Sequence, residues 1–151
     1  MTIRECLPTD ALKIEALFKE FVGYLRSVGD QTSYDFGAEK YLRDGFGPDP
    51  AFRGLVATDG SGLVGYVLFC RTYDGDYVRG IYVVDLFVKQ DSRGRGIGRA
   101  LIDAVRNAAL AAGCTRLSWA VHKGNESAIR FYRSLGARID EESYEMFWDI
   151  A

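Results

Sequence analysis

Cysteine, histidine and proline are scarce in this chain of 151 residues, which has three cysteines, one histidine and three prolines. Cys6, Cys70 and Cys114 are odd in number and far apart, without a CxxC pair, so neither a disulfide framework nor a zinc site is expected. The single histidine, His122, cannot anchor a histidine-rich metal site, and we predict no bound metal. We interpret His122 as a polar residue at the end of a strand.

Long apolar runs and a large excess of one charge are also missing. The longest apolar runs, such as "IYVV" and "AALAA", are too short to cross a bilayer. The first ten residues, "MTIRECLPTD", carry an acid and a proline where a signal peptide would have a basic and then an apolar stretch. The net charge of −2 argues against nonspecific nucleic-acid binding as the main activity. We therefore expect a cytoplasmic protein without a membrane or nucleic-acid partner.

The remaining composition, 48% hydrophobic and 26% charged, is ordinary for a globular protein, and we expect one domain over residues 1–151. Apolar spacing and turn residues predict the element order β, α, α, β, β, β, α, β, α, β. Three of these strands form an antiparallel meander over residues 53–88, with "DGSG" as its first turn. The tail, residues 137–150, is expected to be one strand or a final hairpin. The fold class is therefore mixed α/β, with a mainly antiparallel sheet and a strand–helix–strand unit in its second half.

Capping residues and glycines set the helix boundaries. Thr9 or Asp10 is expected to cap a helix over residues 11–25. An apolar stripe at helical spacing predicts a longer helix over residues 96–112. Asn125 is expected to cap the last helix.

The stretch "QDSRGRGIGRAL" joins the third meander strand to the helix that follows it. It contains three arginines and three glycines: Arg93, Gly94, Arg95, Gly96, Gly98 and Arg99. A helix N-terminus presents unpaired N–H groups and partial positive charge, so it is suited to an anion. Glycine allows positive φ and close approach of the backbone, and arginine pairs with phosphate oxygens. The sequence therefore favours a phosphate site here over the alternative, a solvated basic turn whose glycines serve only tight packing.

Two common phosphate motifs do not fit this stretch. A P-loop ends in Gly-Lys-Ser/Thr, which "GIGRAL" lacks, and the dinucleotide fingerprint needs G-x-G-x-x-G, whereas the spacing here is G-x-G-x-G. The spacing that fits is Arg-x-x-Gly-x-Gly, at Arg93, Gly96 and Gly98. With it, "VVDLFVKQDSRGRGIGRAL" resembles the pyrophosphate-binding motif of the GNAT superfamily of N-acetyltransferases. The chain is most similar to diamine (spermidine/spermine) and thialysine N-acetyltransferases, where "YLRDGFGPDPAFRGLVA", "RTYDGDYVRGIYVVDLFV" and "NESAIRFYRSLGA" have counterparts in the same order.

The resemblance implies transfer of an acetyl group from acetyl-coenzyme A to the primary amine of a small molecule, by direct attack in a ternary complex. The pyrophosphate would lie on the turn that begins at Arg93 and includes Ile97, and the pantetheine arm along Leu86, Phe87 and Val88, in the manner of an added strand. Asn125 would also touch the pantetheine. A bulge in this strand would aim one N–H at the thioester carbonyl and stabilise the oxyanion. The family also implies a homodimer.

The same resemblance assigns catalytic and substrate-binding roles. Tyr132 matches the tyrosine near the sulfur and would protonate the leaving thiolate; its alternative role is core packing. Asp85, an aspartate in an apolar strand, is the best candidate to attract the amine and accept its proton; its alternative role is structural. Asp74 matches an acidic substrate-side position, or else is a turn aspartate. Val84 stands at the substrate-side position where diamine enzymes carry glutamate, which leaves the acceptor amine open.

Other functions are compatible with these residues. The same scaffold would serve a protein or peptide lysine or N-terminal acetyltransferase, or a noncatalytic acyl-coenzyme A-binding domain. The noncatalytic domain would keep the glycine–arginine turn and lose Tyr132, which is present here. The aromatic stretch "YEMFW" near the C-terminus is either a dimer interface or the last core strand, and we favour the core strand.

Overall fold

The computed structural model describes all residues, Met1–Ala151, which form two compact units. Met1–Ala120 holds the sheet and three of the α-helices, and Val121–Ala151 holds the fourth. The strands are β1 (Thr2–Glu5), β2 (Arg53–Asp59), β3 (Gly62–Tyr73), β4 (Arg79–Val88) and β5 (Arg116–Ser118). The helices are α1 (Ala11–Ser27), α2 (Ala38–Phe46), α3 (Ile97–Ala111) and α4 (Glu126–Ser134), with 3₁₀ turns η1 (Pro8–Asp10) and η2 (Gln90–Ser92). The predicted single domain over residues 1–151 stays a prediction.

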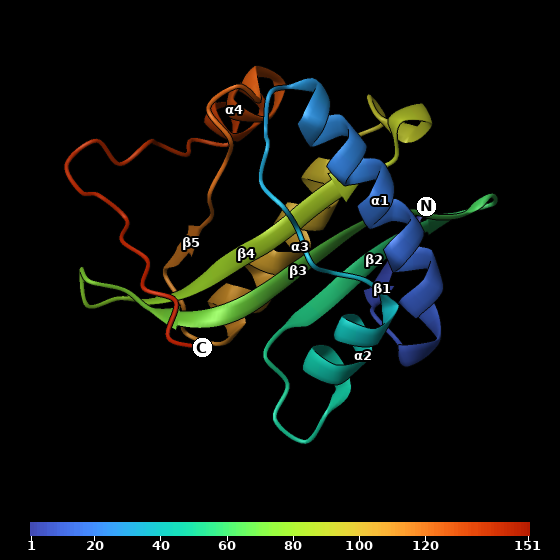
Figure 1. The fold of residues 1–151 in the computed structure, drawn as a ribbon, viewed down its shortest axis with the longest axis horizontal. Helices are drawn as coiled ribbons and strands as arrows, with labels where there is room; N and C mark the ends of the chain where they lie inside the picture. The colour runs from blue at the N-terminus through green and yellow to red at the C-terminus, as the bar shows by residue number, and fades with distance from the viewer. The chain divides into compact units, whose positions relative to one another are not determined.

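The five strands form one sheet in the order β1-β2-β3-β4-β5 (Figure 1). All neighbours are antiparallel except β4 and β5, which α3 connects and which are parallel. The predicted meander over residues 53–88 is confirmed as β2, β3 and β4, and the predicted strand–helix–strand unit as β4, α3 and β5. The fold class is therefore the mixed, mainly antiparallel α/β sheet that the sequence predicts.

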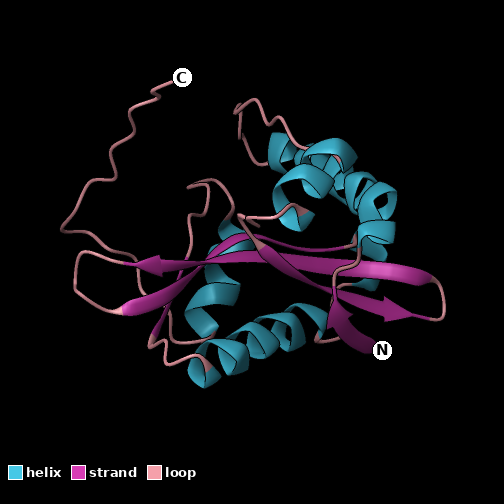
Figure 2. Cartoon of the chain, turned by 90° about the horizontal axis from the view of Figure 1, so that it is seen from below, coloured by secondary structure: helices cyan, strands magenta, loops and turns pink.

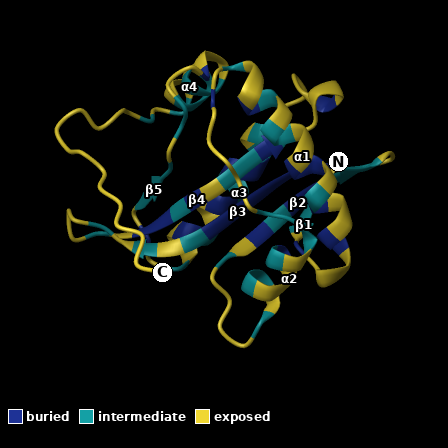
Figure 3. Ribbon diagram, in the orientation of Figure 1, coloured by how far each residue is buried: buried dark blue, intermediate teal, exposed yellow.

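Helices cover both faces of this sheet. Helices α1 and α2 lie on one face and α3 on the other, as the edge-on view in Figure 2 shows. Figure 3 shows β3 buried along its middle, whereas β4 combines buried, intermediate and exposed positions. The core on the α1 side consists of Cys6, Ala11, Ile14, Leu17, Tyr41, Val56, Tyr66, Leu68 and Phe87. None of the helices has the length and apolar composition needed to cross a membrane.

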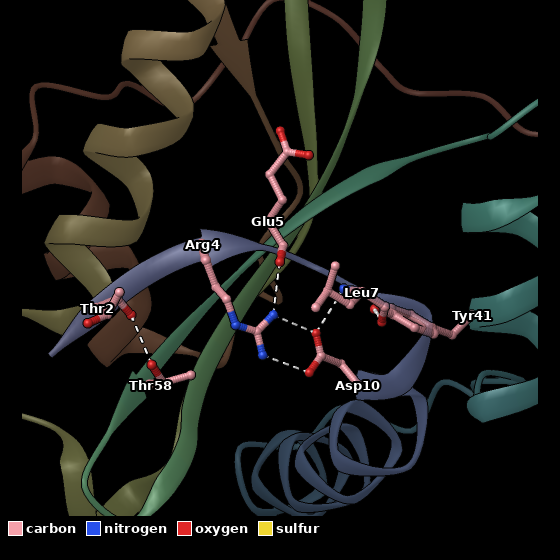
Figure 4. A network of polar contacts seen from close by, with 7 residues as sticks. All are labelled: Thr2, Arg4, Glu5, Leu7, Asp10, Tyr41 and Thr58. Carbon is pink, nitrogen blue, oxygen red and sulfur yellow. Dashed lines mark hydrogen bonds and ion pairs between the residues drawn. The ribbon is translucent and has the colours of Figure 1, made fainter.

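A polar network ties β1 to the start of α1 (Figure 4). Arg4 donates two hydrogen bonds to the Asp10 carboxylate, at 2.8 and 2.9 Å, and the Leu7 amide donates a third at 2.8 Å. The Tyr41 hydroxyl of α2 donates to the Leu7 carbonyl at 2.8 Å. Asp10, one of the two predicted cap residues, is the N-cap residue of α1, but its side chain makes no capping hydrogen bond. Its buried carboxylate is taken by Arg4, which holds the pKa of Asp10 below its ordinary value.

The final strand or hairpin predicted over residues 137–150 is not formed. Residues 137–151 carry neither helix nor strand, and the aromatic stretch near the C-terminus is exposed, with Trp148 at 87% and Tyr144 at 98%. The preference for a last core strand is therefore wrong in this chain. A strand has no hydrogen bonds of its own and forms only beside a neighbour, and the only regular element among residues 121–151 is the helix α4.

Candidate functional site

The centre of β4 contains a β-bulge at Val84. In the ladder with β3, Asp85 pairs with Leu68 and Val83 pairs with Phe69, so Val84 is an extra residue without a partner. Its side chain is 47% exposed. The bulge that the resemblance implied in this strand thus lies just before Leu86, where the pantetheine stretch was predicted to begin.

The bulge places Asp85 on the α1 face of the sheet. Ladder partners share a face, and Leu68 belongs to the core on the α1 side. Val83 pairs with Phe69, which alternation puts on the same face as Gly65, and a Cβ at Gly65 would lie 3.3 Å from a side chain of α3. In a regular strand Val83 and Asp85 would share a face, because side chains repeat every two residues. The extra residue separates them and turns Asp85 away from α3.

Asp85 is half-buried and meets the hydroxyl of a fully buried tyrosine. Tyr66 on β3 donates a hydrogen bond of 3.3 Å to its Oδ2 atom. Burial raises the pKa of Asp85 to about 7, and the bond from Tyr66 opposes that rise. A carboxyl group with a pKa near neutrality is suited to accept a proton at the pH where enzymes work.

β5 lies beside only the first part of β4, so the rest of that edge of β4 is not paired with β5. β5 pairs with β4 only from Gly80 to Tyr82. The following stretch of β4, through Leu86, Phe87 and Val88, therefore has no ladder with β5. An extended ligand binds to such an edge through backbone hydrogen bonds, as an added strand does. The side chain of Phe87 is buried and stacks on Phe21 of α1, with ring centroids 5.1 Å apart, so its part in such a site would be its backbone.

The turn after β4 forms an open cradle of backbone amides. Gly94 and Gly96 have φ of 76° and 78°, the left-handed region that favours glycine, and a Cβ at either position would meet no atom within 4 Å. At Gly94 and Gly96, therefore, tight packing is not what requires glycine. The amide of Ala100 makes the first bond of α3, and the amides of residues 94–99 donate no hydrogen bond within the protein. Ile97 is buried and Gly98 partly buried, so only their amide groups would be available to a bound anion.

Arg93 links this turn to β4 and α1. Its Nε atom donates to the Val88 carbonyl at 2.9 Å. Its guanidinium carbon lies 4.8 Å from the ring centroid of Tyr24 and 5.4 Å from that of Phe87, within the range of cation–π contact. Arg93 therefore fixes the turn against the end of β4, besides placing a positive charge beside the cradle.

The other two arginines of the turn have acidic partners, and one of them lines a polar hollow. Arg95 Nη1 lies 3.7 Å from Asp59, and Arg99 Nε donates to Asp103 at 2.8 Å. A hollow of about 410 Å³ lies between the turn after β4 and the turn after β2. It is lined by Asp59, Gly60, Ser61, Lys89, Asp91, Ser92 and Arg95.

Asp74 lies away from Asp85 within the chain. It is in the turn after β3, where its Oδ1 accepts from the Asp76 amide at 2.9 Å and its Oδ2 from Arg116 Nη1 at 2.8 Å. Asp85 comes six residues after Arg79, where β4 begins, which corresponds to roughly 20 Å of strand. The structure therefore does not bring Asp74 and Asp85 into one site, and Asp74 fills the turn role given as its alternative.

The second unit holds the other two predicted site residues. Asn125 accepts a hydrogen bond of 3.3 Å from the Ala128 amide, which confirms that it caps α4. Tyr132 lies in α4, half-buried, with its ring centroid 5.4 Å from that of Phe131. Their predicted contact with the acetyl donor stays a prediction.

Tyr66 is the site residue that sequence reasoning missed. It lies in the apolar run "LVGYVLF", where its hydroxyl group is the only side-chain polar group. That signal was available, but pairing Tyr66 with Asp85 requires the register of β3 against β4 with the bulge included.

Comparison with known proteins agrees with this geometry. Residues 14–137 match the family model described as the acetyltransferase (GNAT) family. The chain is 37% identical over 145 residues to a thialysine N-epsilon-acetyltransferase of Sus scrofa, covering 90% of this chain and 83% of that protein. It is 29% identical to the spermidine/spermine N(1)-acetyltransferase-like protein 1 of Homo sapiens, covering 96% of this chain and 22% of that protein. A crystal structure of a ribosomal-protein-alanine N-acetyltransferase from Brucella melitensis biovar Abortus 2308 superposes with a TM-score of 0.76 at 26% identity, covering 98% of this chain and all of that one.

The chain therefore belongs to the acetyltransferase (GNAT) family, as its turn motif predicted. Members of this family are N-acetyltransferases, so the protein is an acyltransferase enzyme. Family members use acetyl-coenzyme A as a cosubstrate.

Proposed function

We propose that the protein transfers the acetyl group of acetyl-coenzyme A to the primary amine of a small cationic molecule. The observation that carries the proposal is the arrangement around β4. One short stretch combines an open amide cradle, an unpaired strand edge and a half-buried carboxyl group whose pKa is near 7. The named relatives act on thialysine and, by name, on spermidine or spermine, which supports an amine acceptor.

The residues present fit acetyl-coenzyme A. Its pyrophosphate would take the free amides of residues 94–99, and Arg93, Arg95 and Arg99 add positive charge around them. Its pantetheine arm would pair with the edge of β4 along Leu86, Phe87 and Val88, and Asn125 would add a contact. A backbone N–H at the Val84 bulge, freed from the regular ladder, would stabilise the oxyanion.

Asp85 is assigned the proton-accepting role. An amine like that of lysine has an ordinary pKa of about 10.4, so it arrives as ammonium and must lose a proton before it attacks. Asp85 attracts the ammonium while ionised and accepts the proton, directly or through water. The amine would add to the thioester carbonyl, forming the C–N bond and the oxyanion. The C–S bond would then break as the carbonyl reforms, and Tyr132 would donate a proton to the leaving thiolate. Val84, next to Asp85, would stand on the acceptor side. Asp74 would act there only where a further part of the site, such as a second subunit of a homodimer, brings it near.

Calorimetric titration with acetyl-coenzyme A, followed by thiol release with a panel of amines and peptides, tests the proposal. Tight binding with thiol release for a small primary amine is expected. Release with peptides alone would replace the proposal by a protein lysine or N-terminal acetyltransferase. Binding without release for any acceptor would favour a noncatalytic acyl-coenzyme A-binding domain, and absence of binding would contradict the assignment of the cradle.

A further inference from the structure

Arg93 is the arginine of the turn after β4 whose charge no carboxylate of the protein compensates. Arg95 and Arg99 each face a carboxylate, at 3.7 and 2.8 Å. Arg93 instead donates from Nε to the Val88 carbonyl at 2.9 Å, and its Nη1 and Nη2 atoms make no hydrogen bond within the protein. A guanidinium group has five N–H donors in one plane, so four of them remain for a ligand. Arg93 is therefore the side chain of this turn that is most available to an added anion.

Two aromatic rings lie beside the Arg93 guanidinium, where α1 passes the end of β4 (Figure 1). Its central carbon lies 4.8 Å from the ring centroid of Tyr24 in α1 and 5.4 Å from that of Phe87 in β4. Phe87 is buried and stacks on Phe21, which lies three residues before Tyr24 in the same helix. Residues three apart on a helix are neighbours on its surface, so one face of α1 supports both rings.

The same face of α1 also holds the backbone that leads into the turn. Glu20, four residues before Tyr24, accepts a hydrogen bond of 3.2 Å from the amide of Gln90, where η2 begins. Arg93 itself is exposed, whereas Tyr24 is half-buried. An exposed arginine without such contacts samples many rotamers and loses that freedom when it binds a ligand. The contacts from α1 therefore reduce the entropy that Arg93 would lose on binding an anion.

We propose that Tyr24 is a positioning residue for acetyl-coenzyme A, whose ring holds the Arg93 guanidinium with Nη1 and Nη2 available to the pyrophosphate. The proposal rests on the acetyl-coenzyme A binding proposed above. Tyr24 acts through Arg93, so its effect requires both Arg93 and a pyrophosphate in the ligand. The pantetheine arm, proposed to lie along the edge of β4, does not depend on it.

Calorimetric titration with coenzyme A tests this assignment. Tyr24→Leu should bind coenzyme A about 10-fold more weakly than wild type, a loss within the range of a cation–π contact. Tyr24→Phe keeps the ring and should stay within about 3-fold of wild type. Phe18→Leu is the matched control, because it removes a ring of the same helix that packs against Phe36, with centroids 5.1 Å apart. This control should keep the wild-type affinity for coenzyme A.

Two further measurements separate positioning from support of the fold. S-acetylpantetheine carries the thioester and the pantetheine arm without the pyrophosphate. With this donor, kcat/KM for thiol release should differ by less than about 2-fold between Tyr24→Leu and wild type. In an Arg93→Ala background, Tyr24→Leu should cause no further loss of coenzyme A affinity, because the interaction between the two side chains is already absent.

Three outcomes would overturn the inference and leave the proposed function intact. The first is an unchanged coenzyme A affinity in Tyr24→Leu. The second is an equal loss with acetyl-coenzyme A and S-acetylpantetheine, and the third is a further loss of about 10-fold in the Arg93→Ala background. The last two would show that Tyr24 only supports the fold. A wild-type protein that does not bind coenzyme A would contradict the proposed function together with this inference.

Discussion

Replacing Asp85 with asparagine should change how stability depends on pH. The native-state pKa of Asp85 is about 7, against an ordinary value of 3.8, and burial is the cause. Between about pH 4 and pH 7 the native state therefore keeps a proton that the unfolded chain has released, so the wild-type free energy of unfolding falls as pH rises. A difference of about 3 pH units corresponds to about 4 kcal/mol, all of it lost above pH 7.

Urea unfolding of wild type and Asp85→Asn from pH 4 to pH 9 measures this effect. Asparagine carries no charge. The free energy of unfolding of the variant, relative to that of wild type, should therefore rise by up to about 4 kcal/mol from pH 4 upward, with the change complete near pH 8. Asp49→Asn removes an exposed carboxyl group and should run parallel to wild type at every pH. Parallel curves for Asp85→Asn as well would show that Asp85 is solvated and charged throughout, and would refute both the buried position and the neutral pKa.

Three further predictions test the cradle, the tyrosine partner and the proposed acid. Gly96→Ala and Gly113→Ala should each lose roughly 1 kcal/mol of stability, because both glycines have positive φ (78° and 76°) with open space around them. Only Gly96→Ala should also weaken acetyl-coenzyme A binding, measured by calorimetry. Tyr66→Phe removes a hydrogen bond that lowers the pKa of Asp85, so the pH profile of kcat/KM should move to higher pH, and an unmoved profile would exclude Asp85 as the titrating group. Tyr132→Phe should reduce turnover with nearly unchanged acetyl-coenzyme A affinity, and unaffected turnover would leave Tyr132 a packing residue.

Most of the fold could be predicted because its signals are local. The meander shows itself through "DGSG" and apolar runs, and α3 through an apolar stripe that begins after Gly96. The tail failed as a prediction because alternation describes only one strand, while a strand exists only with a partner. The position of the α1 cap at Asp10 was predicted, but the partner of its carboxylate was not, because bonding to Arg4 in place of the helix amides depends on where β1 lies.

Some features of the candidate site could likewise be predicted from the sequence, and others could not. The amide cradle could be predicted from spacing, since its glycines and the helix after them are contiguous in sequence. The environment of Asp85 could not, because it depends on a ladder register set by residues of β3. Arg93 illustrates an intermediate case. Its charge was correctly placed at the turn, but its contacts with Tyr24 and the Val88 carbonyl require the packing of α1 against β4.

Two adjacent features of β4 produce the edge and the carboxyl group of the candidate site. Pairing with β5 ends at Tyr82, and the extra residue Val84 follows almost at once, so the strand leaves one neighbour and shifts its faces in the same few residues. Because Val84 has no ladder partner and a half-exposed side chain, its side chain contributes little to the sheet. Substitution at this position should therefore alter the acceptor more readily than the fold. The expected result is a Val84 variant that folds like wild type, with Asp85 still paired opposite Leu68, and that differs from wild type in its rates with a panel of amines.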